Sequence, residues 1–110
     1  MGKIIDLGTI VKEPLIFEGC PDGNTYEIPG GISTDFVLTV QKLQGDIQSG
    51  MSEEESIDKL FDILVMVLNL DKTKSVDKAY AKKHFDNIKI INVIIDSVMK
   101  HINDISNDLN

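Results

Sequence analysis

Short runs of strand-forming residues stand in the first third of the chain. Residues 14–18 and 25–28 are rich in residues that favour strands. Between them, residues 19–24 contain a proline, which presets a turn, and two glycines, which accept positive φ. This pattern predicts a β-hairpin. Residues 4–11 are expected to form either a third strand or a flexible leader, and the Pro-Gly-Gly of residues 29–31 is expected to end the strand region.

Beyond the hairpin, apolar residues recur at steps of three and four, which places them on one face of a helix. The first helix is expected to begin near Ser33 or Thr34, either of which can cap free backbone N–H groups, and to end at Gly50. The second helix begins with a capping box at residues 52–55. Because its second half is apolar nearly all round, we expect it to be the central buried helix.

A polar connector at residues 71–75 and a short helix over about 76–84 lead to the last and longest helix, which Asp86 or Asn87 is expected to cap. The apolar positions of this last helix alternate steps of three and four without a break and form a heptad-like seam. The seam consists of Ile88, Ile91, Ile95, Val98, Ile102, Ile105 and Leu109.

The seam of the last helix is longer than its expected neighbour. A helix from residue 86 to 109 spans roughly 36 Å, whereas the second helix spans roughly 28 Å. The final turns then either fray or fold back onto the hairpin, or they meet a second subunit or a partner helix. The second alternative makes Val98, Ile102, Ile105 and Leu109 the candidate protein-binding residues.

These elements together predict an α+β fold that is mostly α, with an N-terminal β-hairpin followed by three to four helices. With 110 residues, of which 42% are hydrophobic, the chain has the size and composition of one domain. We expect residues 1–32 to form the hairpin region, with its leader, and residues 33–110 to form the helical region.

Charge and composition narrow the function. The net charge is −7 and arginine is absent, which argues against nucleic-acid binding, because phosphate contacts need clustered positive charge. Cys20 is the only cysteine and fits a reducing compartment. No apolar run is long enough for a signal peptide or a membrane span, so a cytoplasmic protein is expected. Six lysines between residues 72 and 89 indicate either a solvated face or a docking patch for an acidic partner.

Known catalytic and ligand-binding patterns do not fit the chain. A calcium loop beginning at Asp71 would need glycine and glutamate where Val76 and Lys82 stand. Ser97 follows an aspartate, as in acyl carrier proteins, but it lies inside a long helical pattern. The two histidines and the cysteine show no metal-ligand spacing. We therefore expect no catalytic residue, no cofactor and no metal, and a protein that is not an enzyme.

Two segments carry a family resemblance. Residues 25–33, Thr-Tyr-Glu-Ile-Pro-Gly-Gly-Ile-Ser, lead into a helix, and residues 80–86, Tyr-Ala-Lys-Lys-His-Phe-Asp, precede the isoleucine-rich last helix. In this layout the chain resembles the tail assembly chaperones of siphophages from low-GC Gram-positive hosts.

The resemblance implies a role in assembly. Such chaperones bind the tape-measure protein in the host cytoplasm while the tail tube forms around it, and they are absent from the mature virion. They self-associate as homo-oligomers, and a longer frameshifted form recruits tail-tube protein. The main alternative is a small acidic phage or bacterial inhibitor that acts by protein–protein contact. A small enzyme is a third possibility, but the sequence offers no convergent polar groups for one.

Overall fold

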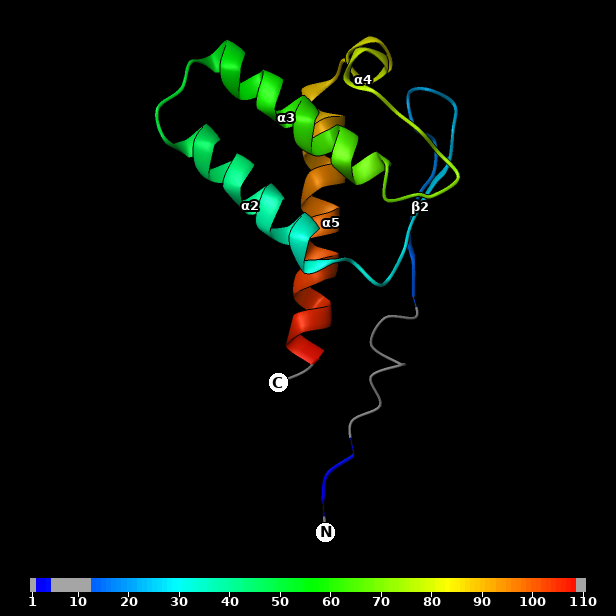
Figure 1. Ribbon diagram of the computed structural model, residues 1–110. Coiled ribbons are helices and arrows are strands. Elements are labelled where there is room, and N and C mark those ends of the chain that lie inside the picture. Colours follow the sequence, from blue (N-terminus) through cyan, green and yellow to red (C-terminus); the bar gives the residue numbers. More distant parts are fainter. Residues whose placement is uncertain (1, 5–12, 109–110) are drawn as a thin grey trace.

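The computed structural model describes residues 2–4 and 13–108, and it places side chains as far as Ile102. Within these ranges a two-stranded hairpin is followed by four helices, so the expected α+β, mostly α fold is confirmed (Figure 1). The predicted third strand or leader at residues 4–11 lies outside the described residues except for Ile4, whose side chain is exposed. None of the described helices is both long and apolar enough to cross a bilayer.

The hairpin forms where the sequence predicts it. Strands β1 (Leu15–Phe17) and β2 (Tyr26–Ile28) are antiparallel, with Ile16 opposite Glu27. Side chains alternate between the two faces of the hairpin, so Tyr26 and Ile28 are fully buried while Ile16 is 52% exposed. The connecting loop contains a turn closed by a 2.9 Å hydrogen bond from the Gly23 N–H to the Cys20 carbonyl, and Gly23 has a φ of 81°, which a glycine adopts without strain.

Helices α2 (Thr34–Gln48) and α3 (Glu53–Leu68) begin at the predicted caps. The hydroxyl of Ser33 accepts the N–H of Phe36, and that of Ser52 accepts the N–H of Glu55, each at 3.2 Å. Gly50 has a φ of 90° in the connection between the two helices, after the end of α2. The predicted helix boundaries are therefore confirmed to within one or two residues.

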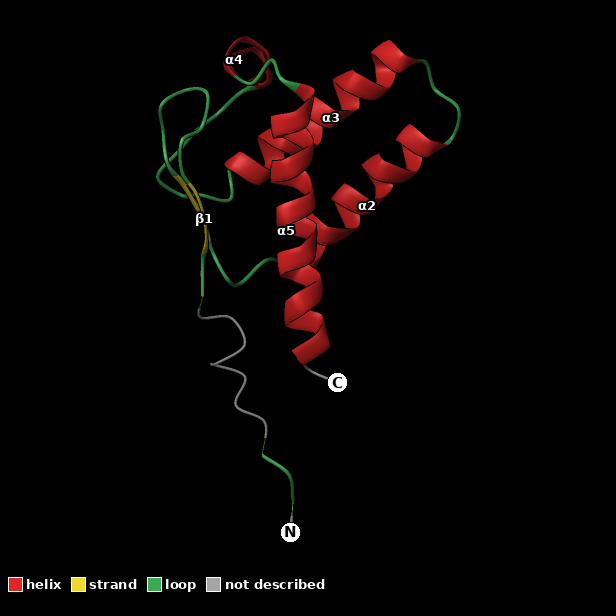
Figure 2. Ribbon diagram, turned by 180° about the vertical axis from the view of Figure 1, so that it is seen from behind, coloured by secondary structure: helices red, strands yellow, loops and turns green. Residues whose placement is uncertain are grey.

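Helix α3 is the central helix, as expected. It packs against α2, α4, α5 and β2. Its second half supplies fully buried side chains to the core, namely Ile63, Leu64, Val67 and Leu68. Figures 1 and 2 show α2 and α3 side by side, with both helices crossing α5. The connection between α2 and α3 lies on one side of α5, and the hairpin lies on the other side.

The last two helices are α4 (Lys78–His84) and α5 (Ile88–Asp108). Helix α4 starts two residues later than expected, because Asp77 is its cap and accepts the N–H of Tyr80 at 2.7 Å. The side chain of Asn87 accepts the N–H groups of Lys89 and Ile90 at the start of α5, as predicted. The predicted solvated connector is wrong at one position, since Asp71 is only 6% exposed.

Candidate protein-binding site

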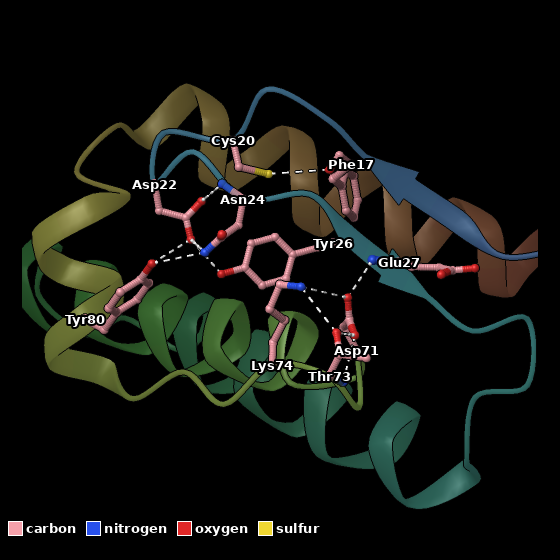
Figure 3. Close-up of polar contacts among 10 residues, drawn as sticks. All are labelled: Phe17, Cys20, Asp22, Asn24, Tyr26, Glu27, Asp71, Thr73, Lys74 and Tyr80. Carbon is pink, nitrogen blue, oxygen red and sulfur yellow. Dashed lines mark hydrogen bonds and ion pairs between the residues drawn. The ribbon is translucent and has the colours of Figure 1, made fainter.

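One carboxylate holds the loop between β1 and β2 against α4. Asp22 accepts the hydroxyl of Tyr26 at 2.7 Å and that of Tyr80, on α4, at 2.9 Å. The backbone N–H and the side-chain amide of Asn24 also donate to it, at 3.0 and 3.1 Å. Figure 3 shows these groups converging on Asp22. The loop is therefore fixed by side chains of β2 and α4.

The same contacts set the protonation states of this cluster. Partial burial acts to raise the pKa of Asp22, but the hydrogen bonds from Tyr26, Asn24 and Tyr80 outweigh it, and the pKa is lowered. Burial, followed by the bond to Asp22, raises the pKa of Tyr26. The bond to Asp22, followed by burial, raises the pKa of Tyr80. An ionised carboxylate that accepts hydrogen bonds from two neutral hydroxyls suits a structural role. We call this arrangement the Asp22 clamp, and none of its three groups changes its protonation state near neutral pH.

A second carboxylate covers the outer edge of β2. Asp71 accepts the N–H of Glu27 at 2.9 Å, and it also accepts the N–H of Thr73 at 2.9 Å and its hydroxyl at 2.6 Å (Figure 3). These bonds lower the pKa of Asp71 to about 2, with the bond from Glu27 as the largest cause. The ammonium of Lys74 lies 3.9 Å from Asp71 and 5.6 Å from the centre of the Tyr26 ring.

Beside the fixed loop lies an apolar groove of about 260 Å³. One wall is the end of β1 and the start of the loop, and the other is the first half of α5. The groove is lined by Phe17, Glu18, Gly19, Cys20, Pro21, Lys89, Ile90, Val93 and Ile94. Val93 is 61% exposed, whereas its neighbours Ile91 and Ile94 on the same helix are buried in the core. Burial, followed by the charge of Asp22, raises the pKa of the Cys20 thiol, so this thiol stays uncharged at neutral pH.

A larger hollow of about 540 Å³ lies along the first half of α3 and is lined mainly by charged side chains, together with Ile57 and Phe61. Its Asp58 is already paired, with Lys78 at 2.6 Å and Lys82 at 2.9 Å. These hydrogen bonds lower the pKa of Asp58 to about 2. Lys78 also lies 3.0 Å from Asp62. Asp58 and Lys82 in the lining of the hollow are therefore already paired within the chain and are less available to bind a ligand.

These ion pairs also bear on the lysine-rich stretch between residues 72 and 89. Two of its lysines bind carboxylates of α3, and Lys74 lies beside Asp71 and Tyr26. Three of its six lysines are thus paired with carboxylates of the same chain. This pairing weakens the alternative that the stretch is a docking patch for an acidic partner. Within the described part of the chain, no group of three or more histidine, cysteine or acidic side chains is arranged to hold a metal ion.

Comparisons with protein-family models, curated proteins and solved structures found no match. The function of the chain is therefore inferred from its own residues and from the family resemblance of residues 25–33 and 80–86.

The four residues that the seam predicted as protein-binding have different places. Val98 is fully buried in the core, and Ile102 is half-buried and packs against it. The side chain of Ile105 and all of Leu109 lie outside the described residues. The binding role of the seam stays a prediction. Val98 belongs to the core, and Ile102 packs against the core.

Sequence reasoning missed the groove, although one local signal was present. Val93 does not belong to the regular seam of the last helix, and an apolar residue outside the seam is a candidate for a surface contact. The other wall could not be assigned, because it depends on the hairpin lying against α5. The Asp22 clamp had a partial signal as well, since an Asp-Gly-Asn stretch favours a local turn bond.

Proposed function

We propose that this protein is a protein-binding assembly factor that holds an apolar segment of its client in the groove between the β1–β2 loop and α5. The groove is the observation that carries the proposal. Its lining includes Phe17 and Ile90, which are half-buried, and Val93, which is more than half exposed. An apolar surface that is left open beside polar residues is typical of sites that bind other proteins.

The size of the groove supports a protein client. Small-molecule sites usually have volumes of roughly 300–1,000 Å³ and several converging polar groups. This groove has about 260 Å³, and its polar side chains are only Glu18 and Lys89, apart from the Cys20 thiol. Such a space accommodates a few side chains of a peptide segment better than it encloses a cofactor.

The groove is also held in shape before any client binds. The Asp22 clamp fixes the loop that forms one wall, and α5, packed against α3, forms the other. A preformed site loses less conformational entropy on binding than a flexible one, so a shallow contact can still give useful affinity. The net charge of −7 helps to keep such a protein in solution while it carries an open apolar surface.

The family resemblance supplies the identity of the client. Under this proposal the protein is a tail assembly chaperone that binds the tape-measure protein and, in a longer form, tail-tube subunits during phage tail assembly. It acts in the host cytoplasm and leaves before the virion is complete. Its gene should then lie between the genes for the tail-tube and tape-measure proteins.

Co-expression with the tape-measure protein encoded beside it tests the proposal. The intact chain should yield a soluble complex. Val93→Glu should weaken capture at least tenfold, because it removes roughly 1.5–2 kcal/mol of apolar contact and adds a charge. Leu38→Glu is the matched control: Leu38 is 62% exposed on α2, outside the groove, and Val93 is 61% exposed. Equal capture by both variants would refute the groove as the binding site.

A further inference from the structure

The hydrogen bond from Glu27 to Asp71 shows which way the strands of the hairpin face. In an antiparallel pair, residues alternate between those that exchange both backbone bonds with the partner strand and those whose N–H and C=O point outward. Glu27 gives its N–H to Asp71 and stands opposite Ile16. Ile16 and Glu27 are therefore an outward-facing pair, and the N–H and C=O of Ile16 point away from β2.

The two edges of the hairpin are consequently different. The edge of β2 is covered by the Asp71 side chain, and the next residue after the strand is Pro29, which has no N–H to offer. The edge of β1 also carries a proline, Pro14, which has no N–H, but it is open at Ile16, whose main chain receives no bond from another described residue. A strand edge that is left open in this way can pair with another extended chain.

The open edge borders the apolar groove. Strand β1 is the strand that packs against α5, and its last residue, Phe17, lines the groove together with Ile90 and Val93 of that helix. An extended segment placed alongside the outer edge of β1, next to α5, would bond to Ile16 through its main chain. Its alternate side chains would then point toward the apolar wall of α5.

We propose that the groove receives its client as an added β-strand next to β1. The client segment is extended, apolar at alternate positions and basic at both ends. This inference rests on the proposed function, because it concerns the same groove, and it specifies the conformation and chemistry of the client segment there.

The negative charge at both ends of β1 favours a client segment with basic ends. It also disfavours a second copy of this chain. Glu13 and Glu18 flank β1, both are exposed, and neither forms an ion pair with a described residue. A second copy pairing antiparallel would place its own two glutamates next to these, and it would also bring a further charge of −7. Lysine or arginine at the ends of the segment instead meets two carboxylates, which outnumber Lys89, the cation in the lining of the groove.

The test uses the full chain and the synthetic peptide Lys-Val-Thr-Val-Thr-Val-Lys, blocked at both ends. Nuclear magnetic resonance should show that the Ile16 amide exchanges freely with water in the protein alone. Adding the peptide should slow this exchange at least tenfold and shift the Val93 signals. The same peptide with glutamates in place of its lysines should bind several-fold more weakly at low salt.

Two matched changes separate strand pairing from simple apolar contact. In an antiparallel arrangement with its valines facing α5, the peptide places a threonine opposite Ile16, because opposite residues share a face and Ile16 faces away from the core. Methylating the backbone nitrogens of both threonines removes the hydrogen bond to the Ile16 carbonyl and should weaken binding about tenfold. In the protein, Ile16→Pro removes the outward N–H without taking a bond from the hairpin, although it also fixes φ, and it should weaken binding similarly. Ile16→Thr keeps the N–H and should not weaken binding. The peptide experiment remains decisive if Ile16→Pro does not fold.

Several results would overturn the inference. Protection of the Ile16 amide in the dilute free protein would mean that the chain itself covers the edge, and protection that rises with protein concentration would indicate a second copy. Equal binding of the methylated and unmethylated peptides would exclude strand pairing. If the tape-measure complex is lost in Val93→Glu but unchanged in Ile16→Pro, the groove binds its client in another conformation, and the proposed function stands without this inference.

Discussion

Replacing Asp71 by asparagine tests whether this carboxylate fastens the hairpin to the helical part of the fold. Asparagine is nearly the same size but is neutral, and only one of its two terminal atoms can accept a hydrogen bond. In the intact protein the carboxylate accepts two backbone N–H groups and one hydroxyl, at 2.6 to 2.9 Å. Glu27 bonds to one carboxylate oxygen and Thr73 to the other, so the substitution leaves one of these two partners without its acceptor.

The pKa of Asp71 gives the magnitude. It falls from an ordinary value of 3.8 to about 2. A difference of this size corresponds to about 2.5 kcal/mol of stability at neutral pH. Because the asparagine oxygen retains part of the bonding, we expect Asp71→Asn to lower the free energy of unfolding by about 1.5–2 kcal/mol.

The sign of the pH dependence follows from the lowered pKa. The unfolded chain binds this proton more tightly than the folded one, so acid favours unfolding. The contribution of Asp71 is complete above the unfolded value of 3.8, and it is lost as the pH falls through about 2. The stability difference between the intact protein and Asp71→Asn should therefore be full at pH 7 and should shrink between pH 4 and pH 2.

Urea denaturation at pH 7, 4 and 2.5 measures this difference directly. Asp96→Asn is the control, because Asp96 is exposed on α5 and has no hydrogen bond or ion pair with a described residue. The control should change stability by less than about 0.5 kcal/mol. A loss below about 0.5 kcal/mol for Asp71→Asn at pH 7, or a loss that stays the same at pH 2.5, would refute the reasoning.

Two further changes test the clamp and the helices. Tyr26→Phe removes a buried hydroxyl that donates to Asp22 at 2.7 Å, and it should cost about 1–1.5 kcal/mol in urea denaturation; no loss would show that the clamp is dispensable. Gly45→Ala should raise stability by about 0.5–1 kcal/mol, because Gly45 lies inside α2 and an added Cβ there meets open space. Gly50→Ala, at a φ of 90°, should instead lower the melting temperature, and a gain there would contradict the backbone argument.

The parts of the fold that were predicted correctly depend on contacts between near neighbours in the chain. Ser33 and Ser52 cap their helices through N–H groups three residues further on, and the period of apolar residues marks the buried face of α3. Asp71 was assigned to a solvated connector because its local sequence is polar. Its main partner, Glu27, lies 44 positions away, so no short-range pattern could reveal the contact.

The candidate site illustrates the same limit. The apolar seam of the last helix was predicted to bind a partner, but most of its described members pack into the core. Val93 is exposed on α5, and it becomes part of a groove because the Asp22 clamp holds the loop after β1 in place beside this helix. A binding surface of this kind arises between elements, so it requires the fold that the local patterns predict as well as the long-range hydrogen bonds that they do not.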